Sequence, residues 1–242
     1  VAVVNASQGL GIVAKALGFH GEVVVPAFAF VATAHSLAWQ GLTPVFCDID
    51  RESHQLDPAA VEAVITERTT GILAAHTWGR PCDIDSLTEL AARHHLQLFF
   101  DAAPAYGASY RGTHIGNFGR AEVLSFHATK VVNSGEGGAI LTNDDEIAAT
   151  ARLMRTFGFA DTDLVTSIGT NAKMSELAAG MGICSLASYD EYLAVNTRNF
   201  DRYRSALAGV PGISVLPCTP GTAINFNNVV IEVDPNRAGI ER

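Results

Sequence analysis

The sequence predicts an α/β fold, in which a mainly parallel sheet is covered by helices on both faces. Short apolar runs rich in Val, Ile, Leu and Phe alternate with longer segments of helical periodicity along most of the chain. Strands that are apolar throughout are typical of parallel sheets buried on both sides. With 242 residues, 48% of them hydrophobic, the chain can form one large domain or a domain with an appendage.

The expected elements follow from these patterns in chain order. The residues at the N-terminus, VAVV, read as a strand leading into a turn, and six further segments read as strands: EVVVP (22–26), TPVFCDI (43–49), TGILAAH (70–76), LQLFFDAA (96–103), AEVLSFH (121–127) and GGAILTN (137–143). Between the strands the periodicity predicts helices, several opening on a capping Asp or Ser, at residues 7–18, 30–41, 58–66, 83–95 and 144–157. A seven-stranded, mostly parallel sheet is the expected result.

The C-terminal part has a different pattern. Residues 174–207 form one long Ala-rich helical stretch, which is too long for a crossover helix and indicates a connector that leaves the main domain. A Pro/Gly-rich segment (209–223) then precedes a strand pattern, INFNNVVIEVD (224–234). We therefore expect a large domain over 1–180, with its N-terminal part missing, and over 181–242 a connector helix with an incomplete small α+β domain.

Composition excludes several functional classes. The net charge of −9 and the lack of a basic cluster argue against a nucleic-acid-binding protein. No apolar run approaches the length of a membrane span, and the N-terminus lacks a signal-peptide pattern. The cysteines are far apart and show no zinc spacing, so neither a metal site nor a disulfide framework is expected, and a reducing, cytoplasmic setting is favoured (Cys47, Cys82, Cys184, Cys218).

Two charged residues at strand ends carry the first chemical signal. The chain has three lysines against thirteen arginines, and Lys130 follows an apolar strand and precedes a Gly-rich turn. Asp101 ends another strand, and ligands of parallel α/β sheets bind beyond the carboxyl ends of the strands. A lysine that forms an imine and an aspartate that keeps a pyridine nitrogen protonated suit a pyridoxal phosphate site. Alternatively, Asp101 caps the following turn.

A phosphate cradle is the remaining requirement of such a site. The segment NASQGLG (5–11) has small residues before a predicted helix, whose N-terminal amides would face an anion. Ser and Gly are also common at ordinary helix starts, so this segment indicates a phosphate site only in combination with Asp101 and Lys130.

Five segments of the chain form a recognisable set: VVVPAFAFVATAHSLAWQGLTPVFCDID, HTWGRPCDIDSL, FFDAAPAYGASYRG, SFHATKVVNSGEGGAILTND and GTNAKMSELAAGMG. Together they resemble the DegT/DnrJ/EryC1/StrS family of sugar aminotransferases, which are fold-type I, pyridoxal-phosphate-dependent enzymes. The resemblance extends from about Asn5 to beyond Tyr192, and the SFHATK and GEGG blocks are its most specific part.

The resemblance implies roles for individual residues. Lys130 corresponds to the Schiff-base lysine and Asp101 to the partner of the pyridine nitrogen, while phosphate contacts fall on Ser7, Gln8 and Ser125. Phe30 occupies the position of an aromatic residue that stacks on the cofactor ring, although ordinary core packing is an alternative. Asn171, with Lys173, matches a block that reaches the neighbouring subunit's site in family dimers, so the resemblance also implies a homodimer. His76, Trp78 and His127 are further candidates for lining the cavity.

Two positions depart from the family pattern. Gln8 replaces a residue that is usually small, and Pro104 stands where the family usually has Gln or His to hydrogen-bond the phenolic oxygen of the cofactor. Proline cannot donate that bond. Either a nearby group replaces it or the electronics of the cofactor differ.

The reaction implied is a ping-pong transfer of an amino group from an amino acid, glutamate or glutamine, to a nucleotide-linked keto-sugar. Lys130 argues against the dehydratase branch of the family, which has histidine there. Another fold-type I enzyme, such as a lyase or a desulfurase, remains open, as does a non-catalytic protein that binds pyridoxal phosphate. A desulfurase would need a mobile nucleophilic cysteine, and none of the four lies in an evident flexible loop.

Overall fold

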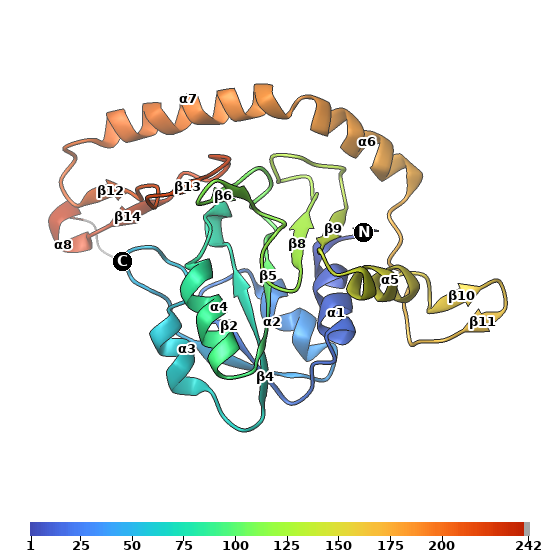
Figure 1. Ribbon diagram of the computed structural model, residues 1–242. Coiled ribbons are helices and arrows are strands. Elements are labelled where there is room, and N and C mark those ends of the chain that lie inside the picture. Colours follow the sequence, from blue (N-terminus) through green and yellow to red (C-terminus); the bar gives the residue numbers. More distant parts are fainter. Residues whose placement is uncertain (240–242) are drawn as a thin grey trace.

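The central element of the computed structural model, which describes residues 1–239, is a seven-stranded sheet (Figure 1). Its strand order is β1-β9-β8-β5-β4-β2-β3, and all strands run parallel except β9, which is antiparallel to both of its neighbours. The strands are β1 (Ala2–Val3), β2 (Glu22–Pro26), β3 (Thr43–Cys47), β4 (Thr69–Ala75), β5 (Gln97–Asp101), β8 (Glu122–Ser125) and β9 (Gly138–Leu141). The predicted α/β class and the mostly parallel, seven-stranded sheet are confirmed.

Helices cover both faces of the sheet, as the uniformly apolar strands predict. On one face, Val23, Leu73 and Phe99 pack in a core with α1 (Ala6–Ala16), α2 (Val31–Ala38) and α5 (Asp145–Met154). On the other face, Ile72 and Phe100 pack with α3 (Pro58–Val64) and α4 (Ile84–Arg93). Alternate residues of each strand therefore enter two separate cores.

The helical stretch predicted over 174–207 is divided in the structure. It forms α6 (Glu176–Ala187) and α7 (Tyr189–Leu207), which meet at Ser188 and cross the top of the view in Figure 1. Ser188 has φ −98° and ψ 7°, and its N–H bonds to the carbonyl of Ser185, three residues back, rather than to that of Cys184, four residues back. The expectation of one continuous helix is wrong. The helical periodicity of the sequence continues across the 3₁₀-type hydrogen bond at Ser188, so the pattern does not reveal the break.

The C-terminal part forms only short strands. The expected strand over 224–234 is reduced to β14 (Ile231–Val233), which pairs with β12 (Ile213–Val215), and a short helix, α8 (Pro235–Ala238), follows. The strand β13 (Thr222–Ala223) joins the hairpin of β6 (Ser109–Tyr110) and β7 (Thr113–His114), so this part packs on the large domain. The boundary proposed at 180/181 falls within α6 and stays a prediction, and the last three residues of the expected small domain lie outside the described residues.

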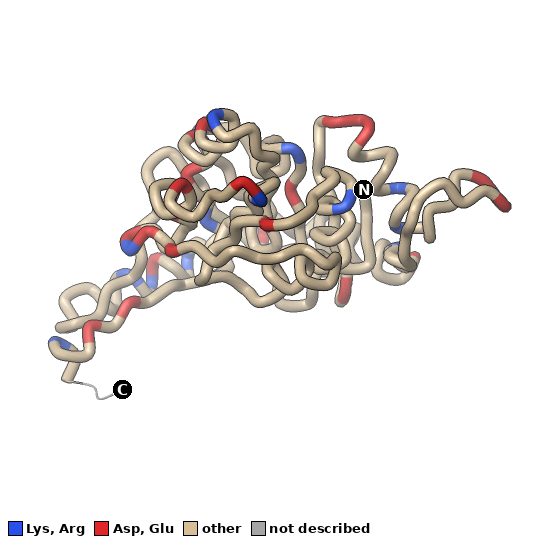
Figure 2. The backbone as a smooth tube through the Cα atoms, turned by 90° about the horizontal axis from the view of Figure 1, so that it is seen from below, with Lys and Arg blue, Asp and Glu red and all other residues tan. Residues whose placement is uncertain are grey.

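One hairpin projects away from the body of the molecule. It consists of β10 (Phe159–Asp161) and β11 (Leu164–Val165), and Figures 1 and 2 both show it extending past α5. Figure 2 also shows acidic and basic residues interspersed over the side that it presents. Over residues 1–239, no helix has the length and apolarity needed to cross a membrane.

The start of α1 depends on one side chain. Asn5 has extended backbone angles, and its Oδ1 accepts a hydrogen bond of 2.9 Å from the N–H of Gln8. We expect Asn5→Ala to lower the free energy of unfolding by about 1 kcal/mol, because the cap is lost. Asn5→Ser keeps an acceptor and serves as the control in urea denaturation. Equal stability of the two variants would contradict a capping role.

Candidate active site

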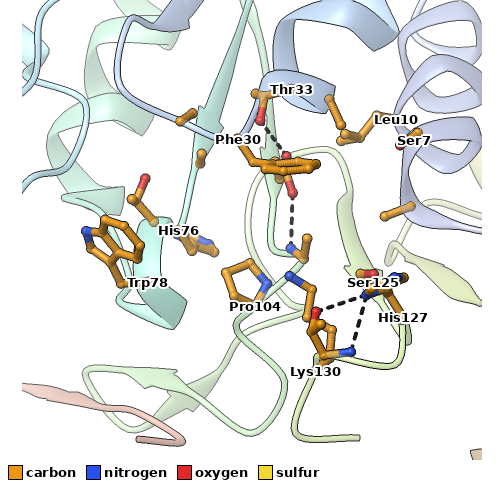
Figure 3. A pocket seen from close by; sticks show the side chains of 18 of the residues that line it. Ser7, Leu10, Phe30, Thr33, His76, Trp78, Pro104, Ser125, His127 and Lys130 are labelled. Atoms are coloured by element: carbon orange, nitrogen blue, oxygen red, sulfur yellow. Dashed lines mark hydrogen bonds between the residues drawn. The ribbon is translucent and has the colours of Figure 1, made fainter. Parts of the chain in front are cut away.

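A pocket of about 760 Å³ opens at the carboxyl ends of the parallel strands. The last residues of β4, β5 and β8 and the residues just after them line it together with the first turns of α1 and α2. Figure 3 shows Ser7 and Ser125 on one side of the pocket and Pro104, His76 and Trp78 on the other, with Phe30 and Lys130 between them. Of the predicted site residues, the pocket brings together Ser7, Phe30, Asp101, Ser125 and Lys130.

Asp101 is the last residue of β5, and only 5% of its surface is exposed. Its Oδ2 accepts a hydrogen bond of 2.7 Å from the hydroxyl of Thr33, and its Oδ1 accepts one of 3.1 Å from the N–H of Ala103. Burial raises the pKa of this carboxyl, while these two donors and the charge of Lys130 oppose the rise. The arrangement is a buried carboxylate held by neutral donors at the pocket wall, which suits a cationic partner.

Lys130 lies in the tight turn that follows β8. Its backbone N–H donates to the carbonyl of His127, which folds the chain back so that the side chain enters the pocket (Figure 3). The side chain is half-buried, and burial lowers the pKa of its amine, opposed by the charge of Asp101. A lowered pKa favours the neutral amine, which is the nucleophilic form.

The side of the pocket near α1 has the features of an anion site. Asn5, Ala6 and Ser7 line it at the helix N-terminus, where backbone N–H groups lack partners within the helix. Gly138 of β9 lets this turn approach the sheet, since a Cβ there would lie 2.8 Å from the nitrogen of Ala6. The buried hydroxyl of Ser125 accepts from the N–H of His127 and keeps its own proton for another acceptor.

Phe30 is the residue before the first turn of α2, and its side chain is 79% exposed. The alternative role in core packing is therefore wrong, because the ring lines the pocket instead of entering either core. An exposed aromatic face beside a cavity is available for stacking on a planar ligand.

The wall opposite α1 is a buried polar network. The backbone N–H of Cys82 donates to Nδ1 of His76, so Nε2 carries the proton and donates to Glu122 over 3.3 Å. Glu122 is fully buried and also accepts from the N–H groups of Gly116 and Phe118, both at 2.7 Å. Because these groups satisfy one another, His76 holds this wall in place.

Pro104 lies in the pocket wall beside this network, as its position in the sequence predicts. Its carbonyl accepts a hydrogen bond of 2.8 Å from Asn225, which also donates to the carbonyl of Tyr106. Asn225 is fully buried, so a residue of the C-terminal part fixes the loop after Asp101. Asn228, from the same segment, is a further lining residue.

Two predicted cofactor residues do not line this pocket. The backbone N–H of Gln8 is bound by Asn5, and its side chain is exposed outside the cavity. Asn171 is exposed and accepts a hydrogen bond of 2.6 Å from Lys173. Its role toward a neighbouring subunit stays a prediction.

Thr33 and Asn228 are among the lining residues that the sequence motifs do not predict. Thr33 carried a usable signal, since it lies one turn after Phe30 on the predicted helix and therefore near the same face. Asn228 carried none, because it comes from a segment about a hundred residues beyond Lys130 in the chain.

The sequence matches the model of the DegT/DnrJ/EryC1/StrS aminotransferase family over residues 1–241. This chain belongs to that family. GDP-perosamine synthase of Caulobacter vibrioides is 40% identical over 201 residues, which cover 82% of this chain and 54% of that protein. A dTDP-4-amino-4,6-dideoxy-D-glucose transaminase of Shigella dysenteriae is 37% identical over 230 residues, covering 95% of this chain and 63% of that protein.

Solved structures of the DegT/DnrJ/EryC1/StrS family have the same fold. DesI, crystallised in the presence of its TDP-sugar product, superposes with a TM-score of 0.96 at 46% identity, over 100% of this chain and 62% of that chain. DesV of S. venezuelae, in complex with a ketimine intermediate, superposes with a TM-score of 0.92 at 34% identity, over 96% of this chain and 64% of that chain. The fold is therefore that of the fold-type I aminotransferases, and the chain spans less than two thirds of the length of these relatives.

Proposed function

We propose that this protein is a pyridoxal-phosphate-dependent aminotransferase that moves an amino group from an amino acid, glutamate or glutamine, to a nucleotide-linked keto-sugar. The observation that carries the proposal is one pocket in which Lys130 and the buried Asp101 lie at neighbouring strand ends. The family membership supports the same activity, and relatives that transaminate nucleotide sugars support the substrate class.

The residues present fit pyridoxal phosphate. Asp101 is a carboxylate buried without a bonded cationic donor among its hydrogen-bond partners, which suits a protonated ring nitrogen. The N-terminal turn of α1 and the Ser125 hydroxyl suit the phosphate, and Phe30 suits the ring face. When bound, the cofactor supplies an aldehyde carbon that takes up amino groups and a ring that withdraws electrons from the reacting carbon.

The chain's own residues then have separate tasks. Lys130 would hold the aldehyde carbon of the cofactor through Nζ, and its amine would move a proton at the substrate carbon. Asp101 keeps the ring nitrogen protonated, and Phe30 holds the ring plane. The turn of α1 and Ser125 would hold the phosphate and so fix the position of the cofactor relative to Lys130.

The half-reaction with the amino donor tests the proposal. The purified protein is loaded with pyridoxal phosphate, and glutamate is added without a keto-sugar. We expect the visible absorbance of the bound cofactor to change and one equivalent of 2-oxoglutarate to form per site. D-Glutamate is the control. A spectrum that is indifferent to every amino donor would instead identify a non-catalytic protein that binds pyridoxal phosphate.

The same proposal includes a homodimer. Large apolar side chains are exposed on the β10–β11 hairpin, on the segment after it and on α6, among them Ile168 at 92% and Leu177 at 86%.

The proposal also includes a reducing, cytoplasmic setting. The free cysteines Cys184 and Cys218 at the surface are in keeping with it.

Light scattering tests the dimer. We expect the protein to be dimeric. Ile168→Asp and Leu177→Asp should each weaken association by roughly tenfold or more, because Ile168 and Leu177 would each bury a large apolar side chain at the proposed interface. Val210→Asp, in the turn after α7, is the control. A monomer that binds the cofactor normally would refute the dimer.

A further inference from the structure

The first turn of α2 supplies two groups to the pocket. Phe30 precedes the helix, and the N–H of Thr33 donates to the carbonyl of Phe30 at 3.0 Å. The Thr33 carbonyl in turn accepts from the hydroxyl of Ser36 at 3.0 Å. The backbone on both sides of Thr33 is thus fixed relative to the aromatic ring.

The Thr33 side chain is bonded away from its own helix. Threonine hydroxyls within helices usually bond back to a carbonyl one turn earlier, as Thr88 of α4 does toward Ile84 at 2.7 Å. The Thr33 hydroxyl instead donates to Oδ2 of Asp101 at 2.7 Å, a residue 68 positions away in the chain, and Figure 3 shows this bond. Only 2% of the Thr33 surface is exposed, so water does not compete for the bond.

The bond constrains the carboxylate as well as stabilising it. Oδ1 of Asp101 already accepts from Ala103, and with Thr33 on Oδ2 the rotation of the carboxylate is fixed from two directions. Each oxygen keeps a second lone pair for a ligand. The titratable groups that act on Asp101 are Lys130, from the turn after β8, and His76, from the end of β4.

We propose that Thr33 is a positioning residue, whose hydroxyl orients the Asp101 carboxylate toward the ring nitrogen of the bound cofactor in register with Phe30. One helical turn then sets both the plane in which the ring is stacked and the direction of its nitrogen partner. This inference rests on the proposed function for the identity of the ligand, but the coupling of Thr33 to Asp101 is a property of the protein alone.

Thr33→Val keeps the shape of the side chain and removes the donor, and Thr33→Ser keeps the donor. In cofactor-free protein labelled with ¹³C-aspartate, we expect Asp101 to titrate about one pH unit higher in Thr33→Val than in wild type, because the ionised form loses a donor. We expect the dissociation constant for pyridoxal phosphate to rise by roughly tenfold. Thr33→Ser is expected to titrate like wild type and to bind pyridoxal phosphate with a dissociation constant within about twofold of wild type.

Thr88→Val is the matched control, since its hydroxyl bonds only to its own helix, and the Asp101 signal is assigned with Asp101→Asn. If Thr33→Val does not fold, Thr33→Ala removes the same hydroxyl and takes its place. An Asp101 titration and a cofactor affinity that are unchanged in both variants, or a Thr33→Ser variant as impaired as Thr33→Val, would overturn the proposal. The titration needs no catalysis, so it stands even if the transfer of amino groups fails its own test.

Discussion

Replacing Lys130 with alanine is expected to abolish the covalent attachment of pyridoxal phosphate and to lower transamination by more than about a thousandfold. The Lys130 amine both attaches the cofactor and carries the proton, so the substitution removes both functions. Proton transfer by a positioned group alone contributes roughly 10² to 10⁴ in rate. The fold should survive, because the half-buried Lys130 reaches into a cavity and fills no core space.

Borohydride reduction of the loaded protein, followed by peptide mapping, checks this prediction directly. The pyridoxyl group is expected on Lys130, and Lys15→Ala and Lys173→Ala should leave it there. Lys173 serves as a control because its amine is already held by other groups: it bonds Asn171 and lies 4.9 Å from the centre of the Phe157 ring. A pyridoxyl group on either of these lysines, or on none, would refute the assignment of Lys130.

Asp101→Asn is expected to weaken pyridoxal phosphate binding and transamination by about a hundredfold or more. Removing one member of a buried, hydrogen-bonded charge pair costs about 2–5 kcal/mol, and each 1.4 kcal/mol is tenfold. The amide keeps the shape of the carboxylate: its oxygen can still accept from the N–H of Ala103, and its nitrogen can donate to the Thr33 hydroxyl. The neutral side chain, however, cannot hold a proton on the ring nitrogen.

In the cofactor-free protein, Asp101→Asn should be favourable for the stability of the fold, in contrast to its effect on cofactor binding. The folded-state pKa of Asp101 is raised above its unfolded value, so stability falls as the pH rises from the unfolded pKa to the folded-state pKa, and the loss stays constant above the folded-state pKa. We therefore expect cofactor-free Asp101→Asn to be at least as stable as wild type at neutral pH. Denaturation at acidic and neutral pH, with the exposed Asp85→Asn as control, measures this. A variant less stable than wild type at neutral pH would contradict the sign.

The sequence by itself determined the sheet, most helices and the two central residues of the site. Strands apolar along their whole length can only be buried on both faces, and the parallel arrangement brings their carboxyl ends to one edge. Asp101 and Lys130 could therefore be placed together without a structure, because each follows a strand recognisable from a few neighbouring residues. The helical caps, such as Asn5, are equally local.

Only the tertiary structure decided what surrounds these two residues. The bond from Thr33 to Asp101 and the bond from Asn225 to Pro104 join residues 68 and 121 positions apart, and no local pattern specifies such pairs. The break at Ser188 and the position of Gln8 outside the pocket also depend on packing. Periodicity reports how a segment meets a neighbour, whereas the partner of a single polar side chain depends on the three-dimensional arrangement of the whole chain.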